Sequence, residues 1–491
     1  MIAYERLNAY ELGLGVREGR YDPEEVIEYF IDRINRINPK ENAFTYTEFD
    51  YARNEAKRLK QRINNGEKVG IFAGVPFALK DFLPSKKGWK ASHGGVPSYI
   101  SVDPIDSEVC KALEKEDAIC VGKTNAPAFG FSAFTDNKMY GPTKNPFDLS
   151  RNSGGSSGGS AVAVASGMVL IAEGGDAGGS IRIPASFNNL FGFKASAGLI
   201  PSVIRPDSFS ATHPYCCTGG LTKSVKDSAL LLNLLVKYDP RDPTSIPFPH
   251  EDFVLSLDKP LKGKRFAYIS GLGILPVEKE VEEKVKSFAK QLEIAGACVK
   301  EVKFSLPRSA KEIMEQWCLH MSFDSYIEFK ELKEKTGLDF LKRHGDELSP
   351  KFVSFVKKAE HIGTKELYEF NLTRTEILDA FMDVFKNYDA ILSPTVCCLP
   401  PKNALAKGET TGPSSINGIE IDPDIGAAPT FLVNFVGFPA ASVPIGLSED
   451  SLPIGMHILC PKYQDALVLS IANAVEKIAP WNGFYFTSMN L

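Results

Sequence analysis

The segment "GGSSGGSAVAVASGMVLIAEGGDAGGSIRIPA", residues 154–185, holds two glycine- and serine-rich stretches with an apolar run between them. Such stretches are common in flexible linkers. Here they bracket residues 161–172, where small apolar side chains predict a buried helix that leads into a strand. That run is too short to cross a bilayer. The segment therefore predicts two glycine-rich bends beside a packed core, and not a linker.

The sequence on either side of this segment continues the alternation of helices and strands. The apolar run "GIFAGVPFALKD", residues 70–81, predicts a strand that ends at Lys80. Residues 107–127 predict a helix, a strand and then a turn. Because short helices and short apolar strands alternate as far as about Val225, we predict a mixed α/β core.

The remaining chain divides into recognisable elements. Asp22 followed by Pro23 predicts the start of an N-terminal helix. A Pro- and Asp-rich surface connection is expected at residues 238–253. The other expected elements are a strand at 264–270, a helix at 277–296, a charged helical excursion at 308–386, strands at 389–396, 438–447 and 452–460, and a helix at 465–478.

Composition excludes several classes of function. The 491-residue chain is 43% hydrophobic and carries a formal net charge of −5, with no long basic run, so we expect a large core and no nucleic-acid partner. No membrane partner is expected either. Nine cysteines are scattered without metal-site spacing, and the apolar surroundings of the adjacent pairs Cys216–Cys217 and Cys397–Cys398 predict buried free thiols. We therefore expect a reducing, cytoplasmic compartment. We expect no metal and no other cofactor.

The serines of the glycine-rich stretches need an activating base. Gly154, Ser156 and Gly158 match the G-x-S-x-G elbow of α/β-hydrolases, but the residues before them resemble a turn. Among the histidines only His457 has a plausible strand context, which amphipathic packing explains equally well. Where histidine is absent, an uncharged lysine can act as the base, and Lys80 is the candidate because it ends an apolar strand. An ion pair with the neighbouring Asp81 is the alternative role for Lys80.

Taken together, these segments resemble the amidase signature family of serine hydrolases. The motifs that carry the resemblance are the opening segment, "GVPFALKDF", "GKTNAPAFG" and "GGLTKSVKDSALLL", and it extends from about residue 22 to 481. It implies one amidase-signature domain, 1–491, with a mixed central β-sheet surrounded by α-helices. The catalytic core would span about 70–225, and the excursion at about 308–386 would cover the site. A softer similarity is to the branch containing 6-aminohexanoate-cyclic-dimer hydrolase.

The resemblance implies specific catalytic groups. The family's lysine falls on Lys80, its serine bound through a cis peptide on Ser156, and its nucleophile on Ser180. Neutral Lys80 would accept a proton from Ser156, which would accept one from Ser180, so that Ser180 can attack a carbonyl carbon. The oxyanion would then face backbone N–H groups, those of Ala177, Gly178, Gly179 and Ser180.

Other residues are expected to support this site or to bind the substrate. Asp176 and Arg182 are predicted to form an ion pair or hydrogen-bond clamp. Ser157 either hydrogen-bonds around the relay or caps the following helix. The expected pocket residues are Phe131, Cys318 and Asn434. The sequence departs from the family pattern at Ala128, Gly175, Ala177, Ala195, Ser196 and Leu199, which affects the expected pocket and not the three catalytic positions.

These observations predict an amidase that acts on a small-molecule amide, with 6-aminohexanoate cyclic dimer or another small linear or cyclic amide as the candidate. One alternative is the glutamine-hydrolysing subunit of a tRNA-dependent amidotransferase. Another is an esterase or carbamate hydrolase with the same groups. A catalytically silent scaffold or binding protein is disfavoured because all three catalytic positions are retained. The sequence leaves open whether the chain forms a homodimer.

Overall fold

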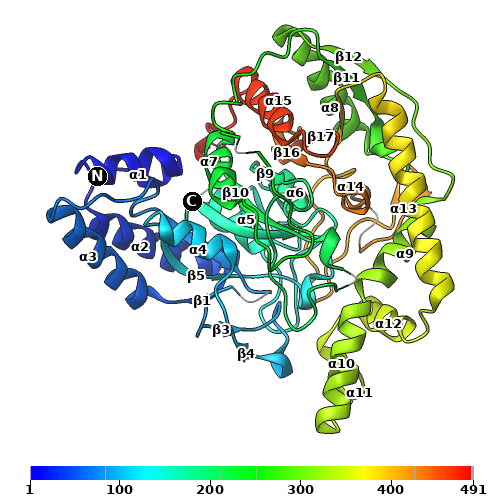
Figure 1. The fold of residues 1–491 in the computed structure, drawn as a ribbon, viewed down its shortest axis with the longest axis horizontal. Coiled ribbons are helices and arrows are strands. Elements are labelled where there is room, and N and C mark those ends of the chain that lie inside the picture. The colour runs from blue at the N-terminus through cyan, green and yellow to red at the C-terminus, as the bar shows by residue number, and fades with distance from the viewer. Residues whose placement is uncertain (1, 83–84, 211, 250, 425–426, 488–491) are drawn as a thin grey trace.

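A computed structural model describes residues 2–82, 85–210, 212–249, 251–424 and 427–487. Its centre is an 11-stranded mixed sheet, which helices surround (Figure 1). The strand order, with bounds, is β1 (Phe44–Thr47), β5 (Ile119–Thr124), β2 (Pro76–Lys80), β8 (Ile171–Asp176), β10 (Cys217–Thr222), β9 (Phe191–Lys194), β16 (Ala440–Leu447), β17 (Pro453–Leu459), β13 (Ala390–Pro394), β11 (Arg265–Tyr268) and β12 (Cys298–Glu301).

Short strand pairs lie outside this sheet. They are β3 (Lys90–Ala91) with β4 (Ser101–Val102), β6 (Lys144–Asn145) with β7 (Asp148–Asn152), and β14 (Ser415–Ile416) with β15 (Ile419–Glu420). The α-helices are α1 (Ala9–Arg17), α2 (Pro23–Glu41), α3 (Phe49–Asn64), α4 (Glu108–Lys115), α5 (Gly158–Ala165), α6 (Arg182–Phe187), α7 (Val225–Leu235), α8 (Lys279–Gln291), α9 (Ala310–Met321), α10 (Phe323–Thr336), α11 (Phe340–His344), α12 (Pro350–Ala359), α13 (Thr364–Phe385), α14 (Phe431–Val436), α15 (Asp465–Ile478) and α16 (Phe484–Thr487). The mixed α/β class predicted from the sequence is confirmed.

Three neighbouring strands position the glycine-rich segments. β2 pairs in parallel with both β5 and β8. Every residue of β2 and β5 is buried, as strands covered on both faces require. Because the carboxyl ends of parallel strands meet at one edge of a sheet, Lys80 at the end of β2 and Asp176 at the end of β8 lie at the same edge.

The apolar run at 161–172 forms the predicted unit of helix and strand. All eight residues of α5 are buried, and β8 follows it. The small side chains of Ala161, Ala163 and Ala165 let a helix fit inside the core, where larger side chains would need more space.

Helices α9–α13 fall within the segment predicted to be a helical excursion. Figure 1 shows them along one side of the molecule, with α10 and α11 projecting, while α1–α3 lie on the opposite side. Trp317 of α9 packs against Phe435 of α14, with ring centroids 4.7 Å apart. Since α14 closely precedes β16 in the chain, this packing joins the excursion to the sheet.

Several predicted boundaries differ from the structure. In the run at 70–81, only Pro76–Lys80 forms a strand, β2. The helix expected at 277–296 is α8, which ends at Gln291, and a single 3-10 turn, Leu292–Ala295, continues the chain. Gly296, at φ 89°, then closes it in the left-handed region that glycine adopts without strain. Among the described residues, no helix combines the length and the apolar character that crossing a membrane requires.

Candidate active site

Lys80 is a buried lysine, and no carboxylate of the described residues binds its amine. Its side chain is 4% exposed, and Nζ donates a hydrogen bond to Oγ of Ser156 at 2.7 Å. The alternative ion pair with Asp81 does not form, because the Asp81 carboxylate accepts from the backbone N–H and hydroxyl of Ser92. The end of β2 therefore directs its amine to a hydroxyl group.

Burial changes the proton affinity of this amine. Loss of water around Lys80 lowers its pKa to about 7, although the carboxylates of Asp176 and Glu173 act in the opposite direction. Near neutral pH, a large fraction of Lys80 is thus uncharged. An uncharged amine can accept a proton, which an ammonium group cannot.

The turn before α5 holds Ser156 in place. The peptide bond between Gly155 and Ser156 is cis, and the Ser156 side chain is 3% exposed. A Cβ on Gly155 would lie 2.9 Å from the carbonyl carbon of Phe134, so only glycine fits here. Ser157 follows, and its N–H donates to the carbonyl oxygen of Ser180 at 3.2 Å. This hydrogen bond joins the two glycine-rich segments.

The side chain of Ser157 does not cap α5. Its hydroxyl donates instead to the carbonyl oxygen of Gly175, near the end of β8, at 3.4 Å. Ser157 therefore links the Ser156 turn to the adjacent strand, as well as to Ser180.

The loop from Ala177 to Ser180 joins β8 to α6 and presents backbone N–H groups. Gly179 has φ 122° and would place a Cβ 2.0 Å from Oγ1 of Thr430, so both its conformation and its surroundings require glycine. Its N–H donates to Oδ1 of Asp176 at 2.7 Å and is already used. Within the described chain, no group accepts a hydrogen bond from the N–H of Ala177, Gly178 or Ser180.

Asp176 and Arg182 form a fully buried ion pair beneath this loop. The distance from Nη2 of Arg182 to Oδ1 of Asp176 is 2.9 Å, and neither side chain is exposed. Burial alone would raise the pKa of Asp176, but Arg182 holds that pKa well below its usual range. The carboxylate thus stays charged and fixes the Gly179 N–H.

Three residues far away in the sequence complete this clamp. Arg182 also donates to Oδ1 of Asn434 at 2.7 Å, and it contacts Nε2 of His457 at 2.9 Å and the carbonyl oxygen of Thr430 at 3.1 Å. Burial and the neighbouring Arg182 hold the pKa of His457 well below its ordinary value, so His457 is neutral and its Nε2 accepts from Arg182. Sequence reasoning did not connect His457 or Thr430 with this clamp.

The predicted pocket residues occupy three different environments. Asn434 has no exposed surface, and its amide donates to Asp176 and to the carbonyl oxygen of Tyr215, so it supports the loop and does not line a cavity. Cys318 of α9 is 1% exposed, and burial raises the pKa of its thiol to about 12.

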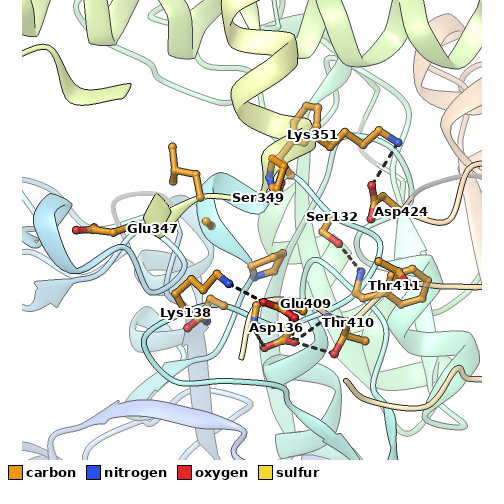
Figure 2. A pocket seen from close by; sticks show the side chains of 18 residues that line it. Ser132, Asp136, Lys138, Glu347, Ser349, Lys351, Glu409, Thr410, Thr411 and Asp424 are labelled. Carbon is orange, nitrogen blue, oxygen red and sulfur yellow. Dashed lines mark hydrogen bonds and ion pairs between the residues drawn. The ribbon is translucent and has the colours of Figure 1, made fainter. Parts of the chain in front are cut away.

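Phe131 does line a cavity, of about 470 Å³. Phe134, whose backbone adjoins Gly155, lines it too. Figure 2 shows charged side chains around this cavity, with Lys351 directed at Asp424 and Lys138 at Glu409. The wall therefore combines aromatic surface with paired charges.

Comparison with known proteins assigns the family. The family model Amidase matches residues 25–469. A solved bacterial aryl acylamidase of the amidase signature family has 36% sequence identity and a TM-score of 0.95, over 99% of both chains. A glutamyl-tRNA(Gln) amidotransferase subunit from Halothermothrix orenii is 34% identical over 96% of this chain and 97% of its own length. A solved 6-aminohexanoate cyclic dimer hydrolase has 25% identity and a TM-score of 0.83, over 98% of both chains. The chain belongs to the amidase signature family and is a hydrolase of carbon–nitrogen amide bonds.

Proposed function

We propose that this amidase cleaves its substrate through an acyl-enzyme on Ser180, with Ser156 and Lys80 as the proton relay. The observation that carries the proposal is the 2.7 Å hydrogen bond between Nζ of Lys80 and Oγ of Ser156 inside a buried site. Burial that lowers the Lys80 pKa to about 7 gives this amine the property that a general base needs near neutral pH.

The proposed reaction begins with two proton transfers. Lys80 takes the proton of the Ser156 hydroxyl, and Ser156 takes that of Ser180, while Oγ of Ser180 forms a bond to the carbonyl carbon. The N–H groups of Ala177, Gly178 and Ser180 would stabilise the resulting oxyanion. Each such donor typically lowers the activation barrier by about 3–4 kcal/mol. Gly179, predicted as a fourth donor, would instead hold the loop through Asp176.

The intermediate then collapses. The carbon–nitrogen bond breaks, and the departing amine receives a proton from the Lys80 ammonium through Ser156. Water subsequently attacks the acyl carbon and gives a proton to the same relay. The bond between that carbon and Oγ of Ser180 then breaks, the relay returns the proton to Ser180, and the acid leaves. The relay matters more for amides than for esters, because it protonates the leaving amine. An alkoxide leaves more readily without a proton than an amine nitrogen does.

We infer that the substrate is an N-acylated arylamine. The 36% identity and the TM-score of 0.95 to an aryl acylamidase support this choice. A second support is local, since a Cβ on Gly178 would meet Nε1 of Trp317 at 3.2 Å and Cβ of Phe431 at 3.4 Å. Aromatic side chains thus lie against the proposed oxyanion loop, where a planar apolar substrate would contact them.

Two further candidates keep specific support. The cyclic dimer of 6-aminohexanoate is favoured by the similar hydrolase fold. Glutamine hydrolysis within an amidotransferase is favoured by the 34% identity to the Halothermothrix orenii protein. Ester or carbamate cleavage would use the same groups.

The proposal is tested by offering the purified chain 4-nitroacetanilide, the linear and cyclic 6-aminohexanoate dimers, glutamine and an aryl ester. We expect 4-nitroacetanilide to give the highest kcat/KM among the amides and Ser180→Ala to lose nearly all turnover. Ser470→Ala is the matched control, because its buried hydroxyl donates to backbone oxygens in and beside α15, and it should retain activity.

Mass spectrometry of the quenched reaction should find one acyl group on the peptide that contains Ser180. Equal turnover by Ser180→Ala and wild type would reject the nucleophile. Preference for glutamine would reject the arylamide substrate.

A further inference from the structure

Trp317 is a buried aromatic residue whose polar atom lies beside the proposed oxyanion loop. Its side chain, on α9, is 4% exposed. The rings of Tyr215 and Phe435, with centroids at 5.5 and 4.7 Å, hold the indole in place. Nε1 lies 3.2 Å from the position that a Cβ on Gly178 would occupy.

The indole N–H of Trp317 has no hydrogen-bond partner in the described part of the chain. The carbonyl oxygen of Gly178, the nearby main-chain acceptor, is taken by Oγ1 of Thr430 at 2.7 Å. Nε1 of Trp317 is not among the fully enclosed, unpartnered polar atoms of the described chain, so it keeps some accessible surface.

Trp481 shows what a structural indole does in this protein. It is 1% exposed, and its Nε1 donates to the carbonyl oxygen of Lys223 at 2.9 Å. A buried donor left without a partner costs about 1–3 kcal/mol. The N–H of Trp317 differs in having no partner within the described chain and in not being fully enclosed, so it is available to a partner that arrives with the substrate.

We propose that the indole N–H of Trp317 donates a hydrogen bond to the carbonyl oxygen of the scissile amide, beside the backbone donors of the Ala177–Ser180 loop. This inference rests on the proposed function, since it uses the attack by Ser180. The carbonyl oxygen gains negative charge in the transition state, so a fixed donor in a dry site strengthens as the reaction proceeds. Trp317 thus adds a side-chain donor to a set that otherwise consists of main-chain groups.

The test compares Trp317→Phe with Trp481→Phe on 4-nitroacetanilide. Both variants lose one indole N–H and keep an aromatic ring. We expect Trp317→Phe to lower kcat/KM about tenfold to a hundredfold, mostly through kcat, because the lost interaction is strongest in the transition state. Trp481→Phe should lower the melting temperature and keep kcat/KM within about twofold, since it removes a hydrogen bond of the fold alone.

The result that overturns the inference is a Trp317→Phe variant with kcat/KM within twofold of wild type, or one whose loss is entirely in KM. Ser180→Ala separates this failure from failure of the proposed function. If Ser180→Ala is inactive and Trp317→Phe has the wild-type kcat/KM, only the role of Trp317 is rejected. If Ser180→Ala is active, the proposed attack by Ser180 is rejected as well. If Trp317→Phe does not fold, benzothienylalanine at position 317 keeps the bicyclic shape without the N–H and is judged by the same limits.

Discussion

Two buried lysines sit at the ends of neighbouring parallel strands and have different partners. Lys80 ends β2 and pairs in register with Thr124 of β5, while Lys123 is the residue before Thr124. Because side chains alternate along a strand, the two lysines leave the sheet on opposite faces. Lys80 meets the hydroxyl of Ser156 at 2.7 Å, and Lys123 meets the carboxylate of Asp103 at 2.5 Å.

This difference shows that the partner decides what a buried lysine does. The Asp103 carboxylate holds Lys123 in a buried ion pair, which gives Lys123 a structural role. A hydroxyl compensates far less for the loss of water, so the pKa of Lys80 falls to about 7. Equal burial thus yields an ion pair on one face of the sheet and a candidate base on the other.

The largest expected effect is on activity and comes from Lys80→Met. Without an amine to accept the proton of Ser156, kcat/KM for 4-nitroacetanilide should fall about 10²–10⁴-fold. The melting temperature at pH 7 should stay the same or rise, because the variant removes a group that loses water on folding. Turnover near the wild-type rate would show that Lys80 is not the base.

The matching change, Lys123→Met, should act on stability instead. It leaves the buried Asp103 carboxylate without its cation, which typically costs about 3–5 kcal/mol. Denaturant unfolding measures this loss, while kcat/KM of the folded enzyme should remain within about threefold of wild type. Adding Asp103→Leu to Lys123→Met should restore part of the stability. If Lys123→Met instead abolished turnover while the protein stayed folded, the contrast between the two lysines would be wrong.

The smallest expected effect is a shift in pH dependence. Protonated Lys80 cannot act, so kcat/KM should fall as pH drops through about 7. Burial raises the pKa of Glu173 to about 7, and its ionised form raises the pKa of Lys80, so Glu173→Gln should move this acid limb to lower pH. A limb that stays in place, or moves to higher pH, would assign it to a group other than Lys80.

Stability should follow pH in the same region. The pKa of Lys80 is about 7 in the folded chain against the ordinary value of 10.5, so the unfolded chain binds more protons between these limits. Lys80 therefore makes the free energy of unfolding rise with pH across this window and fall as pH is lowered towards 7. Lys80→Met should flatten that slope, and an unchanged slope would contradict the folded-state pKa.

Local patterns in the sequence predicted much of the site. The apolar run ending at Lys80, the buried helix after Ser157 and the strand before Asp176 are each set by adjacent residues, and the structure contains them as β2, α5 and β8. The motif resemblance then gave roles to Lys80, Ser156 and Ser180, which stay predictions until the variants are measured.

Contacts between distant parts of the chain could not be predicted in this way. Arg182 contacts three residues that lie about 250 positions further along the chain, Thr430, Asn434 and His457. Each of them lies in an apolar stretch that is also typical of ordinary core packing. Asn434 was accordingly expected in the pocket, although its amide is consumed by the clamp. The strand order, which brings β16 and β17 from the C-terminal region beside β9, is likewise set by tertiary packing.

The most direct test of the neutral-lysine mechanism is the titration of Lys80 itself, followed by NMR of ¹³Cε-labelled lysine in the Ser180→Ala variant, which we expect to be inactive. We expect two lysine resonances to titrate near pH 7, because burial lowers the pKa of Lys223 as well as that of Lys80 to about 7. Lys80→Met should remove one and Lys223→Met the other. If the resonance lost in Lys80→Met titrates above pH 9, Lys80 is an ammonium group at neutral pH, and the relay through Ser156 to Ser180 is contradicted.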